Sequence, residues 1–266
     1  MIPPKPDLSR SSRLSPRRWL AQITAAVTFY TCLPIPGQWP MNFQGIARYA
    51  PLVGLLIGGL LSGLDALLQG LTMPLGTRSA LVVATWVALT GGLHLDGAMD
   101  TADGLAVPAP ERRLAVMADS RSGAFGVMAA VVVLGLKGVA LADIGTLRWF
   151  ALMVAAGWGR WGQVVAIARY PYLKAEGKGA FHKASSHPAV DWMLGLGLLL
   201  AVGLGVWLGG RDRWLFVFGT TLGGFALAVI IGAWLNRKLG GHTGDTYGAV
   251  VEWTEALLLC LMTVLQ

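Results

Sequence analysis

The sequence predicts an all-α, polytopic integral membrane protein with about seven transmembrane helices and an N-terminal interfacial helix. Of its 266 residues, 55% are hydrophobic and only 13% are charged. The mean hydropathy of +0.59 departs from the soluble average toward the membrane class. The apolar residues also fall into runs of about 20 residues, the length that an α-helix needs to cross a bilayer. These runs leave no room for a separate soluble domain.

The amino-terminal segments are too polar or too short to span a membrane. Five basic residues occur within the first 20 positions, and no compact apolar core leads to a cleavage site there, so a cleaved signal peptide is not expected. We expect residues 1–16 to form a flexible basic tail. Segment 17–30 begins with basic and aromatic residues, which favours a helix in the membrane interface. Residues 17–266 are then expected to form one membrane-embedded domain.

Seven apolar segments are candidates for membrane spans. They cover residues 47–68, 79–99, 122–141, 147–168, 190–208, 213–235 and 247–265. The first contains two pairs of glycines four residues apart, Gly54 with Gly58 and Gly59 with Gly63. Such pairs permit close contact between helices. Packing within the chain is the favoured interpretation, and a homo-oligomer interface is the alternative.

The basic residues of the connections are distributed unevenly. If the amino terminus is cytoplasmic, the tail and the connections on its side hold fifteen Lys and Arg, whereas the opposite connections hold four. This bias predicts a multi-pass protein of the cytoplasmic (inner) membrane, with its polar, glycine-rich loops facing the cytoplasm. The net charge of +7 then follows from topology and attraction to the anionic lipid bilayer. No nucleic-acid partner is expected, because no segment resembles a nucleic-acid-binding module.

Three aspartates stand out at the end of one apolar run. The segment from Gly91 to Gly104 reads GGLHLDGAMDTADG, which places Asp96, Asp100 and Asp103 at positions i, i+4 and i+7. On an α-helix these residues fall within roughly 60° of one another. Their carboxylates repel unless a cation lies among them, and hard oxygen ligands suit Mg²⁺ or Mn²⁺. A metal site is favoured over a helix-capping or solvated acidic face.

Other charged residues near this run suggest a site for an anionic substrate. Asp119 is a candidate fourth carboxylate, and Arg121 is a candidate phosphate ligand. Arg160 lies within an apolar segment, where it should face a polar interior or an anion. Lys178 belongs to a glycine-rich basic loop that is equally consistent with a phosphate-binding lid and with a simple positive-inside loop.

The connection before the last span is also unusually polar. It reads GGHTGDTYGA, and its His242, Thr243 and Asp245 precede a helix whose positive N-terminus can bind an anion. Asp245 is a candidate metal ligand or a candidate base toward a hydroxyl proton. Within the last span, Glu252 and Glu255 are expected to face inward and to pair with cationic residues such as Arg160 or Lys137.

Four segments together resemble the cobalamin synthase family in order and spacing. They are GGLHLDGAMDTADGL, MADSRSGAFGV, GRWGQ with the following ARYPY, and GGHTGDTYGA. The resemblance implies a membrane enzyme that joins adenosylcobinamide-GDP to α-ribazole or its 5′-phosphate and releases GMP in a Mg²⁺-dependent step.

The resemblance also implies roles for the candidate residues. The metal ligands would be Asp96, Asp100, Asp103 and Asp119, with Asp119 or Asp245 also a candidate base. Phosphate contacts would come from Arg121, Arg160 and Lys178. The opposite wall, in contact with phosphate or α-ribazole, would be formed by His242, Thr243 and Asp245.

A secondary transporter or a cation channel is the alternative class. Its ionisable residues should lie near the bilayer midplane, often in inverted repeats. Here the sequence contains no visible repeat, and its ionisable residues are expected to gather at one side of the membrane. The pattern therefore favours a transferase.

Overall fold

The structure is a computed structural model that describes residues 16–174 and 178–266. Every element named in these residues is a helix. The α-helices are α1 (Pro16–Tyr30), α2 (Ala50–Gly70), α3 (Leu75–Thr90), α4 (Leu93–Ala106), α5 (Pro110–Val116), α6 (Ala124–Asp143), α7 (Arg148–Arg169), α8 (Lys178–Ser185), α9 (Asp191–Gly209), α10 (Trp214–Leu239) and α11 (Gly244–Leu265). Two 3₁₀ helices, η2 (Ile46–Tyr49) and η3 (Arg211–Arg213), precede α2 and α10. The expected tail, residues 1–16, lies outside the described residues except for Pro16.

Six helices are long and apolar enough to cross a membrane by themselves, which confirms the predicted fold class. They are the segments 46–70, 124–143, 148–169, 191–209, 211–239 and 244–265. The predicted span 79–99 is different, because the chain bends by 91° between α3 and α4. If this bent pair counts as one span, the total is seven.

Two glycines cause the bend between α3 and α4. Gly91 and Gly92 both have positive φ, 59° and 68°, a left-handed backbone that residues with a Cβ rarely adopt. Gly91 terminates α3, and Gly92 precedes the first turn of α4. The aspartate-bearing segment is therefore a separate helix with its own direction, and not the end of a straight span.

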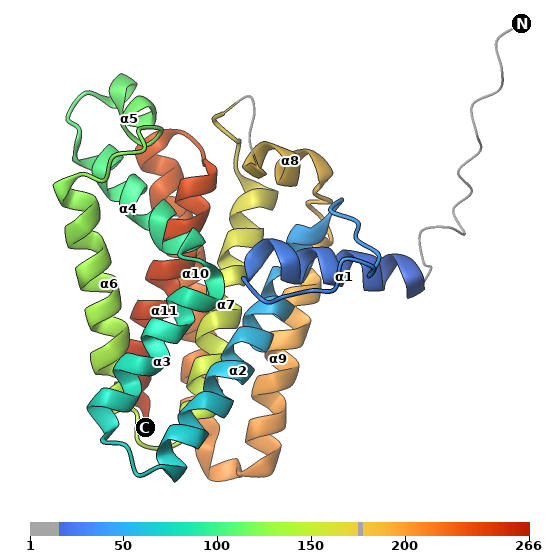
Figure 1. The fold of residues 1–266 in the computed structure, drawn as a ribbon, viewed down its shortest axis with the longest axis vertical. Helices are drawn as coiled ribbons and strands as arrows, with labels where there is room; N and C mark the ends of the chain where they lie inside the picture. Colours follow the sequence, from blue (N-terminus) through green and yellow to red (C-terminus); the bar gives the residue numbers. More distant parts are fainter. Residues whose placement is uncertain (1–15, 175–177) are drawn as a thin grey trace, which may run out of the picture.

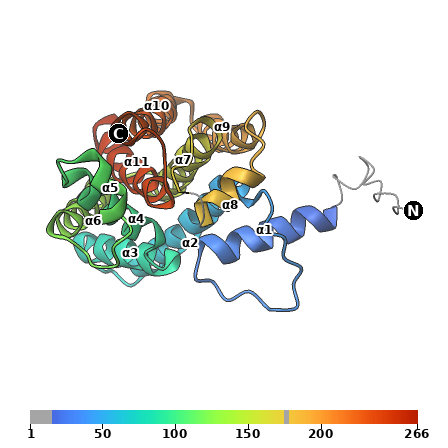
Figure 2. The same cartoon turned by 90° about the horizontal axis from the view of Figure 1, so that it is seen from above.

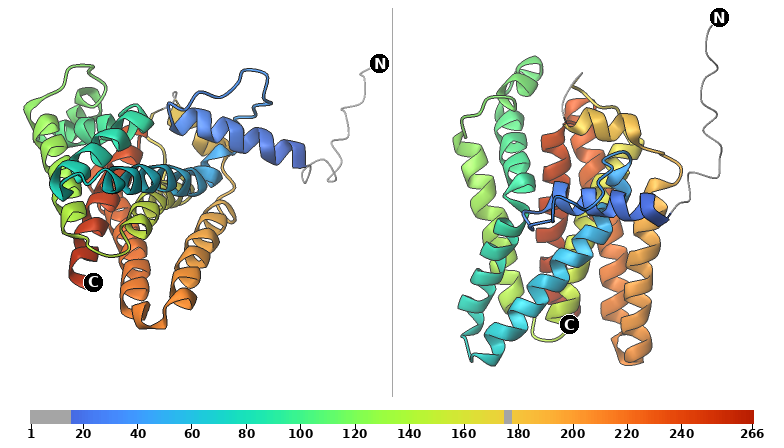
Figure 3. Two further views of the ribbon diagram at one scale, coloured as in Figure 1. Left: turned by 60° about the horizontal axis from the view of Figure 1, so that its bottom comes forward. Right: turned by 45° about the vertical axis from the view of Figure 1, so that its right-hand side comes forward.

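The spans form one bundle whose connections separate into two groups (Figure 1). The segments joining α4 to α6, α7 to α8 and α10 to α11 lie at one end, and those joining α2 to α3, α6 to α7 and α9 to α10 lie at the other. Seen from above, α11 lies among α4, α7 and α10 (Figure 2). Helix α1 lies across the bundle at a steep angle to α9 and α10 (Figure 3). This orientation agrees with the predicted interfacial helix.

Two groups of buried charged side chains lie between the helices of the bundle. This differs from the expectation that ionisable residues gather at one side of the membrane. Asp65 of α2 accepts from Arg148 at 2.6 Å and pairs with Arg78 at 3.1 Å. Arg78 and Arg148 are two of the four basic residues counted in the opposite connections, where exposure is expected, but they are only 7% and 6% exposed.

The second group lies among α6, α7 and α11 and balances two positive with two negative charges. The Lys137 ammonium donates to Glu252 at 2.6 Å and to Glu255 at 2.5 Å, and Arg160 donates to Glu255 at 2.5 Å. The predicted pairing of these glutamates with Arg160 and Lys137 is confirmed. Because each charged side chain pairs with one of opposite charge, these pairings offset the cost of burying the group.

Candidate functional site

Helix α4 lies directly against the amino-terminal turn of α11. A Cβ at Gly97 would lie 2.6 Å from the Asp245 carbonyl oxygen, and one at Gly248 would lie 2.7 Å from the His94 carbonyl oxygen. These two positions therefore require glycine for the backbones to approach so closely. The contact brings the aspartates of α4 beside Asp245, although about 145 residues separate them in the sequence.

A cavity of about 260 Å³ opens at this contact. Its lining comes from α1, α4, α7, α8, the α7–α8 connection and the start of α11, and comprises Phe29, Leu93, His94, Asp96, Gly97, Gln163, Tyr172, Lys174, Gly179, His182, Gly244, Asp245 and Tyr247. Lys174 Nζ donates to Asp245 Oδ2 at 2.9 Å, and the Thr243 hydroxyl donates to the same oxygen at 3.1 Å. The cavity therefore joins two carboxylates, one ammonium group and a helix N-terminus, which is a suitable environment for a phosphate ester.

Asp96 and Asp100 are the two aspartates of α4 whose carboxylates are available to bind a metal ion. Asp96 is exposed and lines the cavity, and Asp100 is half-buried one turn later. The Asp100 carboxylate is repelled by the charges of three aspartates, Asp96, Asp245 and Asp103, and attracted by the charge of Lys174. The predicted clustering of carboxylates is thus present, with Asp245 as an additional member.

Asp103 has a different role, because its carboxylate caps α6. The backbone N–H groups of Gly123 and Gly126 each donate to it at 2.8 Å. A Cβ at either glycine would lie within 2.4 Å of the carboxylate, so the two glycines enclose it. Asp103 therefore has a structural role at the start of α6, and its expected role as a metal ligand stays a prediction.

Replacing Asp103 with alanine is expected to destabilise the protein by about 1–3 kcal/mol, because two backbone N–H groups lose their acceptor. The thermal midpoint in detergent should fall, whereas Asp103→Asn, which keeps one acceptor oxygen, should fall less. An unchanged midpoint for the alanine variant would show that the cap contributes nothing.

Asp119 and Arg121 pair with each other in the loop before α6. Arg121 Nη2 donates to Asp119 Oδ2 at 2.8 Å, and its side chain is 88% exposed. Side-chain and backbone hydrogen bonds from Arg121 lower the pKa of Asp119 to about 2, which makes it a weak base. Neither residue lines the cavity, so the structure does not bring Asp119 and Arg121 to it, and their expected roles toward a metal ion and a phosphate stay predictions.

Arg160 and Lys178 cannot be assigned to the cavity either. Arg160 is fully buried and bonded to Glu255, so the expected phosphate contact is corrected to a buried ion pair. Lys178 begins α8, but its side chain lies outside the described residues, and its expected phosphate contact stays a prediction.

His242 and Thr243 stabilise the connection between α10 and α11 that carries Asp245. His242 is fully buried, with Nδ1 3.0 Å from the Thr246 hydroxyl and Nε2 3.1 Å from the Gly232 carbonyl oxygen. Burial lowers its pKa to about 4. Thr243 is the N-cap of α11 in a capping box with Thr246. Of the expected opposite wall, only Asp245 reaches the cavity, and the other two hold the loop that carries it.

Within residues 16–174 and 178–266, no group of three His, Cys, Asp or Glu side chains is arranged to hold a metal ion. The structure thus contains no preformed ligand cluster within the described residues, and the expected four-aspartate metal site stays a prediction. Asp96 and Asp100 remain as a pair of oxygen ligands. Because Mg²⁺ is commonly held by one or two carboxylates together with substrate phosphates, the pair still fits this ion.

Four lining residues were missed as site residues in the sequence: His94, Gln163, Lys174 and His182. His94 directly precedes the aspartate motif, and Lys174 and His182 flank the glycine-rich loop after α7. Their residue types could have identified them as site residues, because His and Gln are uncommon in apolar segments. Their convergence depends on the packing of four separate elements.

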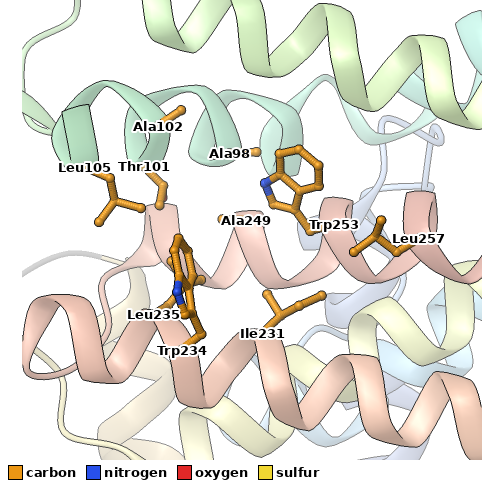
Figure 4. Close-up of a pocket in the computed structure, with 10 residues that line it drawn as sticks. All are labelled: Ala98, Thr101, Ala102, Leu105, Ile231, Trp234, Leu235, Ala249, Trp253 and Leu257. Carbon is orange, nitrogen blue, oxygen red and sulfur yellow. The ribbon is translucent and has the colours of Figure 1, made fainter.

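A second cavity, of about 310 Å³, lies on the other side of α4 (Figure 4). Trp234 of α10 and Trp253 of α11 face Ala98, Thr101 and Leu105 of α4 across it. No candidate site residue lines this cavity. Its apolar walls offer nothing to a phosphate, so the chemistry is assigned to the acidic side of α4.

Comparisons with known proteins identify relatives that cover nearly the whole chain. The family described as cobalamin-5-phosphate synthase matches residues 22–263. A protein of Trichormus variabilis named adenosylcobinamide-GDP ribazoletransferase is 57% identical over 246 residues, which are 92% of this chain and 98% of that protein. A protein of the same name from Synechococcus elongatus is 51% identical over 251 residues, 94% of this chain and 99% of its own. No solved structure matches the chain significantly.

Proposed function

This chain belongs to the cobalamin-5-phosphate synthase family, and we propose that it joins adenosylcobinamide-GDP to α-ribazole or its 5′-phosphate with release of GMP. The observation that carries this proposal is the close contact of Gly97 and Gly248, which sets Asp96 beside Asp245 and Lys174 in the lining of one cavity, with Asp100 one turn further along α4. A nucleoside diphosphate ester requires charge neutralisation of this kind.

The reaction is a displacement at phosphorus. A ribose hydroxyl oxygen of the acceptor forms a bond to the corrinoid-side phosphorus, and the bond from that phosphorus to the oxygen of GMP breaks. Asp245 accepts the hydroxyl proton, since it is a carboxylate in the cavity lining; hydrogen bonds from Lys174 and Thr243 to its Oδ2 fix its position. Lys174 and the N-terminus of α11 at Gly244 stabilise negative charge on the departing phosphate.

Asp96 and Asp100 would hold Mg²⁺, an ion that one or two carboxylates commonly bind. When bound, the ion would neutralise charge on the diphosphate. The two aspartates therefore orient the donor, while Asp245 acts on the acceptor. The charge distribution of the connections supports a cytoplasmic location for this end of the bundle in the inner membrane.

The proposal is tested with the full chain in lipid nanodiscs, supplied with adenosylcobinamide-GDP, α-ribazole and Mg²⁺. We expect the coupled product and GMP in equal amounts. If GMP were released but α-ribazole were not joined to the corrinoid, the protein would be a hydrolase, and this result would contradict the proposal. Parallel reactions with α-ribazole 5′-phosphate give the preferred acceptor from the ratio of kcat/KM values.

Chelation of divalent cations with EDTA is expected to abolish product formation, and excess Mg²⁺ is expected to restore it. Ca²⁺ should restore less, because it takes more ligands at longer distances than the compact shell that Mg²⁺ requires. Initial rates after each addition provide the measurement. Full activity in EDTA would remove the metal from the proposal and leave Lys174 as the main source of positive charge.

Replacing Asp245 with asparagine is expected to lower kcat by about 10²-fold or more, the usual contribution of a positioned base. The KM for adenosylcobinamide-GDP should change little, since Asp245 acts on the acceptor. Asn keeps an oxygen for Thr243 and Lys174, so the fold should persist. A normal kcat would assign proton removal elsewhere.

A further inference from the structure

The inner wall of the site cavity concentrates buried polar atoms that have no partner within the described residues. Both ring nitrogens of His94 and of His182 are unpartnered, as are Gln163 Oε1 and the Tyr247 hydroxyl. All four side chains line the cavity and belong to residues no more than 5% exposed. Buried polar groups are costly unless they are bonded. Their convergence on one space therefore indicates a ligand with hydrogen-bonding groups of its own.

The same wall is built from aromatic rings. Tyr30 does not itself line the cavity, but its ring stacks on two histidines that do, with centroids 6.1 Å from His94 and 6.2 Å from His182 and interplanar angles of 15° and 16°. Phe29 packs its ring edge-to-face with His182 at 4.6 Å. Tyr172 and Tyr247 stack at 6.0 Å on another part of the wall. Such surfaces suit a flat ring.

Charge divides the cavity into two parts. The charged lining residues are Asp96, Lys174 and Asp245, and we call the part of the cavity that they line its charged part. Burial lowers the pKa of His182 to about 4, so at neutral pH its ring is uncharged and offers one donor and one acceptor. The inner part therefore favours an uncharged heteroaromatic ring, while the charged part favours a sugar hydroxyl or a phosphate.

We propose that this inner wall binds the heteroaromatic base of the acceptor, α-ribazole, and that His94, His182 and Gln163 determine specificity for it. The inference rests on the proposed function. His94 and Asp96 line the same cavity, so a base bound at His94 lies close to the reacting phosphate. In α-ribazole only the ribose separates the base from the attacking hydroxyl. In the donor, guanine is separated from the attacked phosphorus by a ribose and a further phosphate.

Two nearly isosteric variants, His182→Phe and Gln163→Leu, test this assignment in the full chain in nanodiscs. Each should raise the KM for α-ribazole about tenfold, the effect of losing one hydrogen bond. The KM for adenosylcobinamide-GDP should stay within about twofold. Calorimetric titration with α-ribazole should show the same weakening. The control is His187→Phe, because His187 lies outside this cavity, and both KM values should remain unchanged.

A second measurement does not depend on any variant. The unaltered protein is titrated with an α-ribazole analogue in which indole replaces benzimidazole, so that the free ring nitrogen becomes a C–H. It should bind about tenfold more weakly than α-ribazole. Equal binding of the two compounds would show that no polar group reads that nitrogen and would overturn the assignment.

Other outcomes separate this inference from the proposed function. If the variants raise the KM for the donor instead, the wall binds guanine and the inference is wrong. If they change neither KM nor α-ribazole binding, the cavity contains only water and the inference is again wrong. If the unaltered protein forms no product, the proposed function fails, and the titrations still decide whether the cavity binds α-ribazole.

Discussion

Replacing Asp96 with asparagine is expected to lower kcat by about 10³-fold, because the change removes one of two carboxylates proposed to hold the metal on the diphosphate. Asp96 is exposed at the cavity and makes no hydrogen bond to another described side chain, so the fold should be unaffected. Initial rates at saturating substrates and the thermal midpoint give the two measurements. Asp100→Asn should behave similarly, because it lies one turn later on the same helix.

The matched control is Asp143→Asn. Asp143 is an exposed aspartate at the end of α6, away from the cavity, and its replacement should leave kcat unchanged. Raising the Mg²⁺ concentration should partly recover Asp96→Asn, since a weakened metal site is still occupied at high concentration. Near-normal turnover by Asp96→Asn would contradict the proposed metal site even if the transferase activity were established.

The sequence was sufficient for the spans and for the grouping of the connections, because both depend on long apolar runs that a bilayer requires. It was insufficient at the bend before α4. Glycine is common in membrane helices, and the sequence alone does not specify that both Gly91 and Gly92 adopt positive φ. The helix-periodicity argument still applied within α4, because that segment is helical.

The roles of the aspartates could be predicted only in part. Periodicity places Asp103 on the same face as Asp96 and Asp100, but the start of α6, about twenty residues later, supplies the N–H groups that bind it. Arg78 and Arg148 appeared to be loop residues because they lie at the ends of apolar runs. Asp65, an unexplained carboxylate within a span, was the signal that they have a buried partner. Long-range partners of this kind are not encoded in local spacing.

Replacing Glu255 with glutamine is expected to destabilise the protein by about 3–5 kcal/mol, because Lys137 keeps Glu252 but the buried Arg160 loses its carboxylate partner. Glu255 is fully buried and accepts from both Lys137 and Arg160. The thermal midpoint in detergent should fall by roughly 10 °C. The exposed Glu111 provides the control, since Glu111→Gln removes the same charge without uncovering a buried cation.

The double variant Lys137→Met, Glu252→Gln separates charge balance from simple loss of contacts. It removes one charge of each sign and leaves Arg160 paired with Glu255, so its midpoint should lie closer to that of the unaltered protein than the midpoint of Glu255→Gln does. If Glu255→Gln instead kept its midpoint and lost activity, the group would have a functional role within the membrane. Such a role would restore weight to the transporter alternative, because ion pathways use intramembrane carboxylates that are not needed for folding.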